Sequence, residues 1–389
     1  MKQINIKIFV IACVLIIVVL GAILVISRAN KSSLEGAVFY YKTEGKDSNL
    51  FYMKSGKESE HLIVLPSEEI DLDKYKVLKH SYISHNGKTL IYFERIGEVP
   101  VGVVSEEEGL MAYKIIYKPK YVDLKSNSMK DIEQDMDSVS LVFSPNDKKI
   151  AWVSTVEEAT VEELELARKK REVWISNPNG GKAKHLVSLD ETVVLFQKWH
   201  GNYIYFWGIP GAGHYSIGRI NVKNGRVEYV KPKYCTENLG NCKNFRFSRS
   251  GESFIYEVDL IEEGKKTIKL FVESFDGEKS WQILVNNYIS DRLWLPDEKS
   301  VIYTEQVEVP KIGFREKIHQ VNLKTNEDKE IYSGNYVSQI VPDGSGKYLY
   351  FIEKETDEKF NLIELNIEQG EAKIIDFGEY NYLKIFSGI

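Results

Sequence analysis

Hydrophobic and polar positions alternate along most of this chain in short stretches, separated by turns rich in Asn, Asp, Gly and Lys. Such alternation, bounded by turn residues, predicts β-strands. One phrase recurs seven times: a Ser or Pro, a polar turn, then a strand that closes on an aromatic residue. The clearest copies are Ser84–Tyr92, Ser144–Trp152, Ser248–Tyr256, Pro296–Tyr303 and Pro342–Tyr350, and weaker copies end at Tyr40 and Tyr205.

The closing aromatic residues follow one another at intervals of about 50 residues. A strand-bearing repeat of this length is typical of a β-propeller or another repeat array. One unit has too little apolar surface to form a core alone, so neighbouring units are expected to stack. We therefore expect a single repeat domain over residues 37–389, although the length of 389 residues alone allows two or three domains.

The third unit shows how one repeat folds. Pro, Asn and Asp favour a tight turn at Ser144–Lys148, and Asn and Gly favour a hairpin turn at Asn177–Gly181. These turns separate four apolar stretches, which predicts one four-stranded antiparallel blade. The four predicted strands are Val139–Phe143, Ile150–Ser154, Glu172–Ser176 and Lys184–Leu189.

The two ends of the repeat domain complement each other. The first unit begins near Ala37 and has no leading strand, whereas the chain ends with the unpaired strand Tyr382–Phe386. Phe386-Ser387 matches the phrase that closes the leading strands at Phe143-Ser144 and Phe247-Ser248. We therefore predict an all-β, seven-bladed β-propeller of four-stranded antiparallel blades, closed by the C-terminal strand joining the first blade.

The Ser-Pro-Asn/Asp-Gly-Lys turn before an Ile-x-Tyr/Trp strand resembles the TolB-like and WD-like propeller repeats of bacterial envelope proteins. It is also similar to the propeller of the dipeptidyl peptidase IV group, without the hydrolase domain. The resemblance covers Ala37–Ile389 and implies a binding platform or a domain that gates a hydrolase. The second unit departs from the pattern, with a long insert at Glu94–Gly109 and an irregular stretch at Met111–Leu124.

An uncharged apolar stretch, Ile8–Ile26, is long enough to span a bilayer as a helix. We expect residues 1–7 to be a short cytoplasmic N-terminus, 8–26 a transmembrane signal anchor and 27–36 a linker. The alternatives are a cleaved signal peptide, with Ser27 and Ala29 before the cut, and lipidation at Cys13. The length of the apolar stretch favours the anchor, which places the propeller outside the cytoplasm.

Charge excludes one class of partner. The chain has 51 basic and 57 acidic residues, a formal charge of −6, with both signs interspersed. Nucleic-acid binding needs concentrated Lys and Arg. The basic run Arg168–Arg171 follows a Glu-rich stretch and fits a solvated helix face. No nucleic-acid partner is expected.

Two cysteines, Cys235 and Cys242, lie close together in a segment that is rich in turn-forming residues. A zinc site needs further ligands at suitable spacing, and the neighbouring sequence offers none. A local structural disulfide in an exported domain is the favoured interpretation, and a pair of free thiols is the alternative.

The sequence does not contain the catalytic or metal-binding motifs that we considered for a propeller protein. The chain lacks the Gly-x-Ser-x-Gly elbow of serine hydrolases, H-E-x-x-H and a D-x-D-x-D-G calcium loop. Asn146 and Lys148 replace the Asp and Gly of a sialidase box. His200 and His214 are close enough in sequence to meet, but a structural role is favoured for each. We predict no enzyme activity, no cofactor and no catalytic, cofactor-binding or metal-binding residues.

Long segments between the second and third strands of a blade fall on one face of the predicted ring. Insertions on one face often mark a binding face, although exposed loops also tolerate changes in length. We predict a membrane-anchored, non-catalytic binding module for a protein or envelope glycan. The alternatives are a hydrolase with carboxylates at the central channel and a gating or sensor domain for a separate hydrolase or transporter. The long segments are Glu94–Gly109, Thr155–Arg171 (helix-like), Gly208–His214, Asp259–Lys266 and Gln306–Glu316.

Overall fold

The structure is a computed structural model that describes most of the chain from Ala37 to Ser387. The predicted membrane span Ile8–Ile26 and linker 27–36 lie outside the described residues, as do residues 155–170 of the helix-like segment. Within the described ranges, no helix is long and apolar enough to cross a bilayer. These ranges are 37–44, 47–54, 60–66, 81–105, 110–134, 136, 140–154, 171–210, 215–235, 242–262, 265–283, 285, 288–310, 313–356, 359–379 and 383–387.

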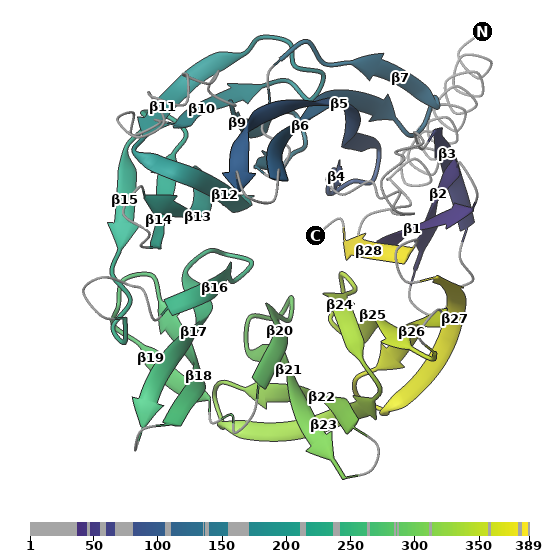
Figure 1. The fold of residues 1–389 in the computed structure, drawn as a ribbon. Coiled ribbons are helices and arrows are strands. Elements are labelled where there is room, and N and C mark those ends of the chain that lie inside the picture. Colours follow the sequence, from purple (N-terminus) through teal and green to yellow (C-terminus); the bar gives the residue numbers. More distant parts are fainter. Residues whose placement is uncertain are drawn as a thin grey trace, which may run out of the picture.

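The strands form seven four-stranded sheets, each antiparallel throughout, arranged as blades around an axis (Figure 1). Blade 1 consists of β28 (Leu383–Ser387), β1 (Val38–Glu44), β2 (Asp47–Met53) and β3 (Glu60–Pro66). Blade 2 consists of β4 (Ser81–Ile83), β5 (Thr89–Ser105), β6 (Leu110–Asp123) and β7 (Ser128–Asp131). Blade 3 consists of β8 (Leu141–Phe143), β9 (Ile150–Val153), β10 (Arg171–Ser176) and β11 (Lys184–Leu189). Blade 4 consists of β12 (Glu191–His200), β13 (Tyr203–Pro210), β14 (Ser216–Asn221) and β15 (Val227–Val230). Blade 5 consists of β16 (Cys242–Phe247), β17 (Ser253–Glu262), β18 (Lys265–Ser274) and β19 (Ser280–Ile283). Blade 6 consists of β20 (Tyr288–Trp294), β21 (Ser300–Val309), β22 (Gly313–Asn322) and β23 (Glu327–Gly334). Blade 7 consists of β24 (Val337–Pro342), β25 (Tyr348–Lys354), β26 (Lys359–Asn366) and β27 (Glu371–Glu379).

The predicted propeller of four-stranded antiparallel blades is therefore confirmed. One prediction about blade 2 is wrong: Met111–Leu124 is not irregular, because Leu110–Asp123 forms the long strand β6. Its partner β5 runs without a break through Glu94, and the two strands pair from Thr89↔Asp123 to Ser105↔Leu110. Register shifts within this pairing accommodate residues that interrupt the alternation.

The C-terminal strand belongs to the first blade, as the sequence predicted. β28 pairs antiparallel with β1, with Val38 opposite Ser387 and Lys42 opposite Leu383. β28 is thus the innermost strand of blade 1, and it also contacts β24 of blade 7. The first and last segments of the repeat domain meet in one sheet, which joins the two ends of the ring (Figure 1).

The repeated phrase forms the turn between the first and second strands of a blade. A buried hydroxyl at its first position accepts a hydrogen bond from the backbone N–H that starts the second strand. Ser84 Oγ lies 2.9 Å from Thr89 N, and Ser144 Oγ lies 2.9 Å from Lys149 N. In blade 7 the carboxylate of Asp343 takes this role, 3.1 Å from Tyr348 N. A small side-chain acceptor at this position therefore fixes where the second strand begins.

In this turn, the residue whose backbone N–H bonds back to the carbonyl of the residue three before it adopts a left-handed backbone conformation. Gly87 and Gly251 have φ of 67° and 79°, as expected for glycine, but Asp147 and Glu298 have φ of 58° and 55° at the same position. The two acidic side chains contact the corresponding turn of the preceding blade. Asp147 accepts hydrogen bonds from the backbone N–H groups of His85 and Asn86, at 3.0 and 2.9 Å, and Glu298 accepts one from the Ser250 hydroxyl at 2.7 Å. These carboxylates connect neighbouring blades, which offsets the strain of a non-glycine residue there.

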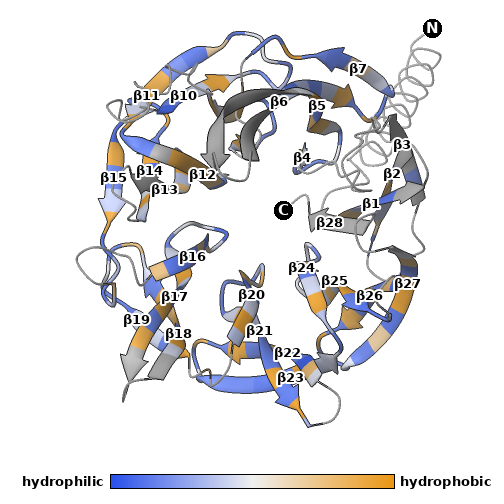
Figure 2. Cartoon of the chain, viewed as in Figure 1, coloured by the Kyte–Doolittle hydropathy of each residue, from blue (hydrophilic) through white to orange (hydrophobic). Residues whose placement is uncertain are grey.

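Hydrophobic clusters are shared between blades. Val38 and Tyr40 of blade 1 pack with Tyr350 and Ile352 of blade 7, and all four side chains are at most 1% exposed. In Figure 2 the hydrophobic stretches alternate with hydrophilic ones along the strands. Burial of one such side chain stabilises the fold by roughly 1.5–3 kcal/mol. The alternating pattern therefore supplies apolar side chains to both neighbours of each blade.

The closing aromatic residues are buried in the second strand of their blades, and their polar atoms have partners. Burial and a neighbouring carboxylate raise the pKa of the Tyr256 and Tyr303 hydroxyls, so both groups remain donors at neutral pH. The repeated aromatic position is thus both a core residue and a hydrogen-bond donor. The partners are Asp376 for Tyr40 (3.0 Å), Ser176 for Trp152 (3.1 Å), Glu273 for Tyr256 (2.9 Å), Asp328 for Tyr303 (2.7 Å) and Glu364 for Tyr350 (2.5 Å).

Replacing Tyr256 with Phe tests this second role. Glu273 is 1% exposed, so loss of the hydroxyl removes a donor from a buried carboxylate. We expect Tyr256→Phe to lower the free energy of unfolding by about 1–3 kcal/mol, measured by urea denaturation. Tyr92→Phe is the matched control, because the Tyr92 hydroxyl donates to the weak acceptor Met129 Sδ at 3.3 Å. An equal or larger loss for Tyr92→Phe contradicts the interpretation.

Candidate binding face and the wall of the ring axis

The two faces of the ring are built differently. In each blade, the tight turns after the first and third strands lie on one face, which we call the turn face. The hairpins between the second and third strands, and the links to the next blade, lie on the opposite face, which we call the hairpin face. The segments that the sequence singled out as long loops belong to the hairpin face.

Most of the described part of these segments is not loop. Asp259–Lys266 lies almost entirely in β17 and β18, and Gln306–Glu316 lies almost entirely in β21 and β22. Their strands remain paired to Glu262↔Lys265 and Val309↔Gly313. Alternation continues into the insert, as in Gln306-Val307-Glu308-Val309, and sustains the pairing. The predicted loops are therefore extended β-hairpins that present their residues on paired strands.

Three exposed aromatic side chains lie on the hairpin face around blade 6. Tyr288 begins the innermost strand β20, Phe314 lies beside the tip of the β21–β22 hairpin, and Tyr336 lies in the link from blade 6 to blade 7. Their exposed fractions are 57%, 61% and 41%. Large exposed apolar side chains gathered on one surface indicate a site for another molecule. We call this set the blade 6 aromatics.

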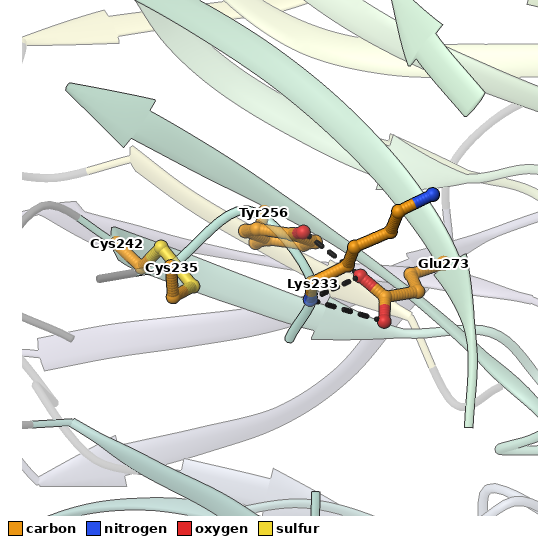
Figure 3. Close-up of a disulfide and its surroundings, with 5 residues drawn as sticks. All are labelled: Lys233, Cys235, Cys242, Tyr256 and Glu273. Carbon is orange, nitrogen blue, oxygen red and sulfur yellow. Dashed lines mark hydrogen bonds between the residues drawn. A yellow bond between two sulfur atoms is a disulfide. The ribbon is translucent and has the colours of Figure 1, made fainter. Parts of the chain in front are cut away.

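The link from blade 4 to blade 5 also crosses the hairpin face. The structure joins Cys235 in this link to Cys242, the first residue of β16, by a disulfide (Figure 3). Cys235 is 8% exposed and Cys242 is fully buried, and both pack with Phe245 and Tyr256 in the core of blade 5. The two cysteines that the sequence singled out thus attach the link to the innermost strand.

Hydrogen bonds hold the same link from the other side. The backbone N–H of Lys233 donates to both carboxylate oxygens of Glu273, at 3.2 and 3.0 Å, beside the Tyr256 hydroxyl (Figure 3). The ring of Tyr234 stacks on Phe271, with 4.1 Å between ring centroids. The described part of the link is therefore fixed against blade 5.

The innermost strands of blades 4 to 7 carry β-bulges that the sequence analysis did not anticipate. Bulges redirect side chains and are frequent near functional sites. In β16 and β24 the bulged residues Asn244 and Gln339 have positive φ, 60° and 54°. A possible signal was the polar interruption of an apolar strand, as at Ser290-Asp291-Arg292 in β20. The register shifts fall between Phe196 and Lys198, Lys243 and Arg246, Ile289 and Arg292, and Ser338 and Val341.

Polar side chains connect these bulges around the axis. Arg292 of β20 forms an ion pair with Glu257 of β17, and Asn244 Nδ2 donates to the other oxygen of Glu257 at 3.1 Å. Arg246 Nη1 donates to Gln197 Oε1 in the bulge of β12, at 3.2 Å. Arg292 and Glu257 are 6% and 1% exposed, so their ion pair compensates two buried charges, and Lys243 Nζ lies 3.9 Å from the same carboxylate.

Asp291 extends this polar wall toward blade 7. Its backbone N–H donates to Thr304 Oγ1 at 2.7 Å, and burial raises the pKa of its carboxyl group. Burial also raises the pKa of Glu316, which accepts a hydrogen bond from the backbone N–H of Val337 at 2.8 Å. Both carboxyl groups accept hydrogen bonds from backbone N–H groups, Asp291 from Arg292 at 2.8 Å and Glu316 from Val337.

The described residues were also compared with what a metal site or a catalytic histidine would need. Among them, no three His, Cys, Asp or Glu side chains are placed to hold a metal ion. The ring of His319 stacks on Tyr303, and its Nδ1 lies 2.9 Å from Asp328 Oδ1. These contacts indicate a structural role for His319. His200 is exposed beside the turn that follows β12, and His214 lies outside the described residues.

Comparison with known proteins agrees with the fold. No protein-family model matches the chain, and no curated protein matches it. Among solved structures, a prolyl endopeptidase matches with a TM-score of 0.61 and 11% identity, over 92% of this chain and 50% of that chain. An oligogalacturonate lyase in complex with manganese matches with a TM-score of 0.52 and 9% identity, over 79% of each chain. TolB from Acinetobacter baumannii matches with a TM-score of 0.44 and 12% identity, over 89% of this chain and 82% of that chain.

The chain is a β-propeller protein, and the resemblance noted from its repeat holds at the level of the fold. It spans about half the length of the prolyl endopeptidase chain. Likeness at these identities shows the fold alone, and the TM-score of TolB is too low to carry an argument. Function must therefore be argued from the surfaces of this chain.

Lys198 provides a test of how closely the blades pack near the turn face. Its Nζ donates to the backbone carbonyl of Ser248 in blade 5, at 2.7 Å, and burial lowers its pKa to about 7. In the unfolded chain the pKa of a lysine is about 10.4. Between these values the unfolded state binds more protons, so the contribution of Lys198 to stability grows as pH rises from 7 toward 10.

We therefore expect the free energy of unfolding of the wild type to rise relative to that of Lys198→Met between pH 7 and pH 9.5. The expected gain is on the order of 1 kcal/mol, because partial solvent access screens the charge. Urea denaturation of both proteins at both pH values measures it, and the subtraction removes other titrating groups. A difference that does not change with pH contradicts the buried position of this amine.

Proposed function

We propose that this protein is a non-catalytic binding module that docks a protein partner on its hairpin face. The observation that supports the proposal is the exposure of the blade 6 aromatics, Tyr288, Phe314 and Tyr336, on that face. Aromatic side chains are enriched at the centres of protein interfaces, where they contribute much of the binding energy. The partner surface should be apolar at its centre and polar at its rim.

The mechanism is rigid presentation. Phe314 lies on a strand that pairs with Glu308, and Tyr288 pairs with Gln306, so the backbone at both positions is held by the sheet. A binding surface that is already ordered loses little conformational entropy when a partner binds. The ring holds the β-hairpins of the hairpin face in a fixed arrangement, so less of the binding free energy is spent on ordering them.

The proposal includes a place in the cell. The apolar stretch Ile8–Ile26 acts as a signal anchor, and the propeller faces outside the cytoplasm. The disulfide between Cys235 and Cys242 supports export, because disulfides persist in oxidising compartments. A single-pass anchor would hold the binding module close to the membrane that it serves.

A photo-crosslinking amino acid, p-benzoylphenylalanine, at position 314 tests the proposal in cells that express the full chain. We expect a discrete protein adduct from Phe314→p-benzoylphenylalanine. The adduct yield should fall at least about fivefold when Tyr288 and Tyr336 are also replaced by Ala, because interface aromatics commonly contribute 1–2 kcal/mol or more each. Mass spectrometry of the adduct identifies the partner.

Ile374→p-benzoylphenylalanine is the matched control. Ile374 is 58% exposed, but it lies within the outermost strand β27 of blade 7, opposite Ile363, and not in a hairpin or link of the hairpin face. The same adduct from both positions, or an adduct that persists in the Tyr288→Ala/Tyr336→Ala background, overturns the docking site. A glycan adduct at position 314 overturns the choice of a protein partner. Hydrolysis of a peptide or glycan by the purified protein, at a rate above that of buffer, overturns the non-catalytic assignment.

A further inference from the structure

One cation on the wall of the ring axis has unused hydrogen-bonding capacity. Arg246 lies on β16, the innermost strand of blade 5, which among the described strands pairs with β17 alone and so turns its other edge toward the axis (Figure 1). Its side chain is exposed although its strand is the innermost of blade 5. Within the described part of the chain, the guanidinium has one hydrogen-bond acceptor, Gln197 Oε1, and forms no ion pair. A guanidinium carries five N–H donors, so most of them remain available.

We infer that the ring axis contains a binding site for a ligand carboxylate, with the guanidinium of Arg246 as its main recognition group. This site is separate from the blade 6 aromatics and does not depend on the proposed protein partner. The carboxylate belongs to a small organic acid or ends a peptide chain. The two sources share the same chemistry at Arg246.

The charges around Arg246 favour an added anion. Burial and the neighbouring Arg246 lower the pKa of Arg292 to about 9, so Arg292 keeps its charge at neutral pH. Glu257 neutralises Arg292 through their ion pair, and its other carboxylate oxygen accepts a hydrogen bond from Asn244 and lies 3.9 Å from Lys243 Nζ. Arg246 therefore has a like charge, Arg292, and an acidic group, Asp291, within electrostatic range, but it forms no ion pair among the described residues. A bound carboxylate would compensate this charge.

Arg246 contacts both neighbouring blades before any ligand binds. Gln197 fixes one end of the guanidinium from blade 4, at 3.2 Å. The indole N–H of Trp294, from blade 6, donates to the backbone carbonyl of Arg246 at 3.1 Å. Blade 6 thus holds the backbone of Arg246 and blade 4 contacts its guanidinium, and such partial preorganisation reduces the entropy lost on binding.

The same surroundings favour a carboxylate over a phosphate. The planar fork of a guanidinium matches the two oxygens of a carboxylate in a bidentate pair. Asp291 lies close enough to interact electrostatically with Arg246. A phosphate dianion would be repelled by Asp291 when it is ionised and would need a second free cation. A carboxylate carries one negative charge rather than two, so Asp291 repels it less, and the charge of Arg246 alone can balance it.

The test measures binding to the purified protein by the ¹⁵N–¹H signal of the Arg246 side chain. Sodium acetate is the small-acid probe, N-acetyl-Ala-Ala-Ala is the peptide probe, and N-acetyl-Ala-Ala-Ala-amide lacks the charge. We expect saturable shifts with one or both carboxylates, and none with the amide or with sodium chloride at equal ionic strength. Shifts by acetate and by the peptide acid together indicate that the site recognises the carboxylate alone, and a shift by the peptide acid only indicates a peptide terminus.

Variants separate recognition from general charge. For these proteins, affinity is measured by calorimetry with the carboxylate probe that bound. Arg246→Gln should weaken binding about tenfold or more, since a charge-assisted bidentate pair is lost. Arg246→Lys, which keeps the charge but loses the fork, should also weaken binding. Arg249→Gln makes the same charge change at an exposed position in the following turn and should leave affinity unchanged.

Two outcomes overturn the inference. If chloride shifts the Arg246 signal as strongly as the carboxylates do, the site holds an adventitious ion only. If Arg246→Gln and Arg249→Gln weaken binding equally, or if no probe shifts the signal, there is no carboxylate site at Arg246. Circular dichroism of each variant confirms that loss of binding is not loss of folding.

Discussion

The antiparallel pairing of β28 with β1 is the contact on which the rest of the structure depends. It places the end of the repeat domain against its beginning, so that the blades form a ring. Without that pairing, the inner edge of β1 and the flank of blade 7 would be open to water and to other chains. The ring in turn fixes which hairpins share a face and which strands line the axis.

Two kinds of surface follow from closure, and they have different physical origins. The hairpin face is an extension of the sheets: Phe314 and Tyr288 lie on paired strands, so their exposure is not an accident of a mobile loop. The axis wall arises instead where innermost strands lose their regular register. There Asp291 lies in the bulge of β20, and Arg246 and Arg292 directly follow the bulges of β16 and β20, so the three come close together only because blades 5 and 6 are neighbours.

The fold was largely predictable from the sequence because its signals are local and repeated. Turn residues and a closing aromatic recur in each unit, and the match of Phe386-Ser387 with Phe143-Ser144 predicted the strand exchange. The length of the hairpins was misjudged, because charged residues alternating with Val look like loop composition although the pairing continues. The axis wall could not be predicted, because the contact of Arg246 with Gln197 depends on bulges and on packing between blades. Exposure of Tyr288 or Phe314 is likewise a property of the assembled ring.

Closure is tested most directly by hydrogen–deuterium exchange of the amides in Val38–Lys42, compared between the full chain and a chain ending at Glu379. The account predicts slow exchange of these amides in the full chain, similar to that of Tyr348–Ile352 in β25, and fast exchange once β28 is removed. Fast exchange at Val38–Lys42 in the full chain, or the same slow exchange in both chains, would contradict a ring closed by the C-terminal strand.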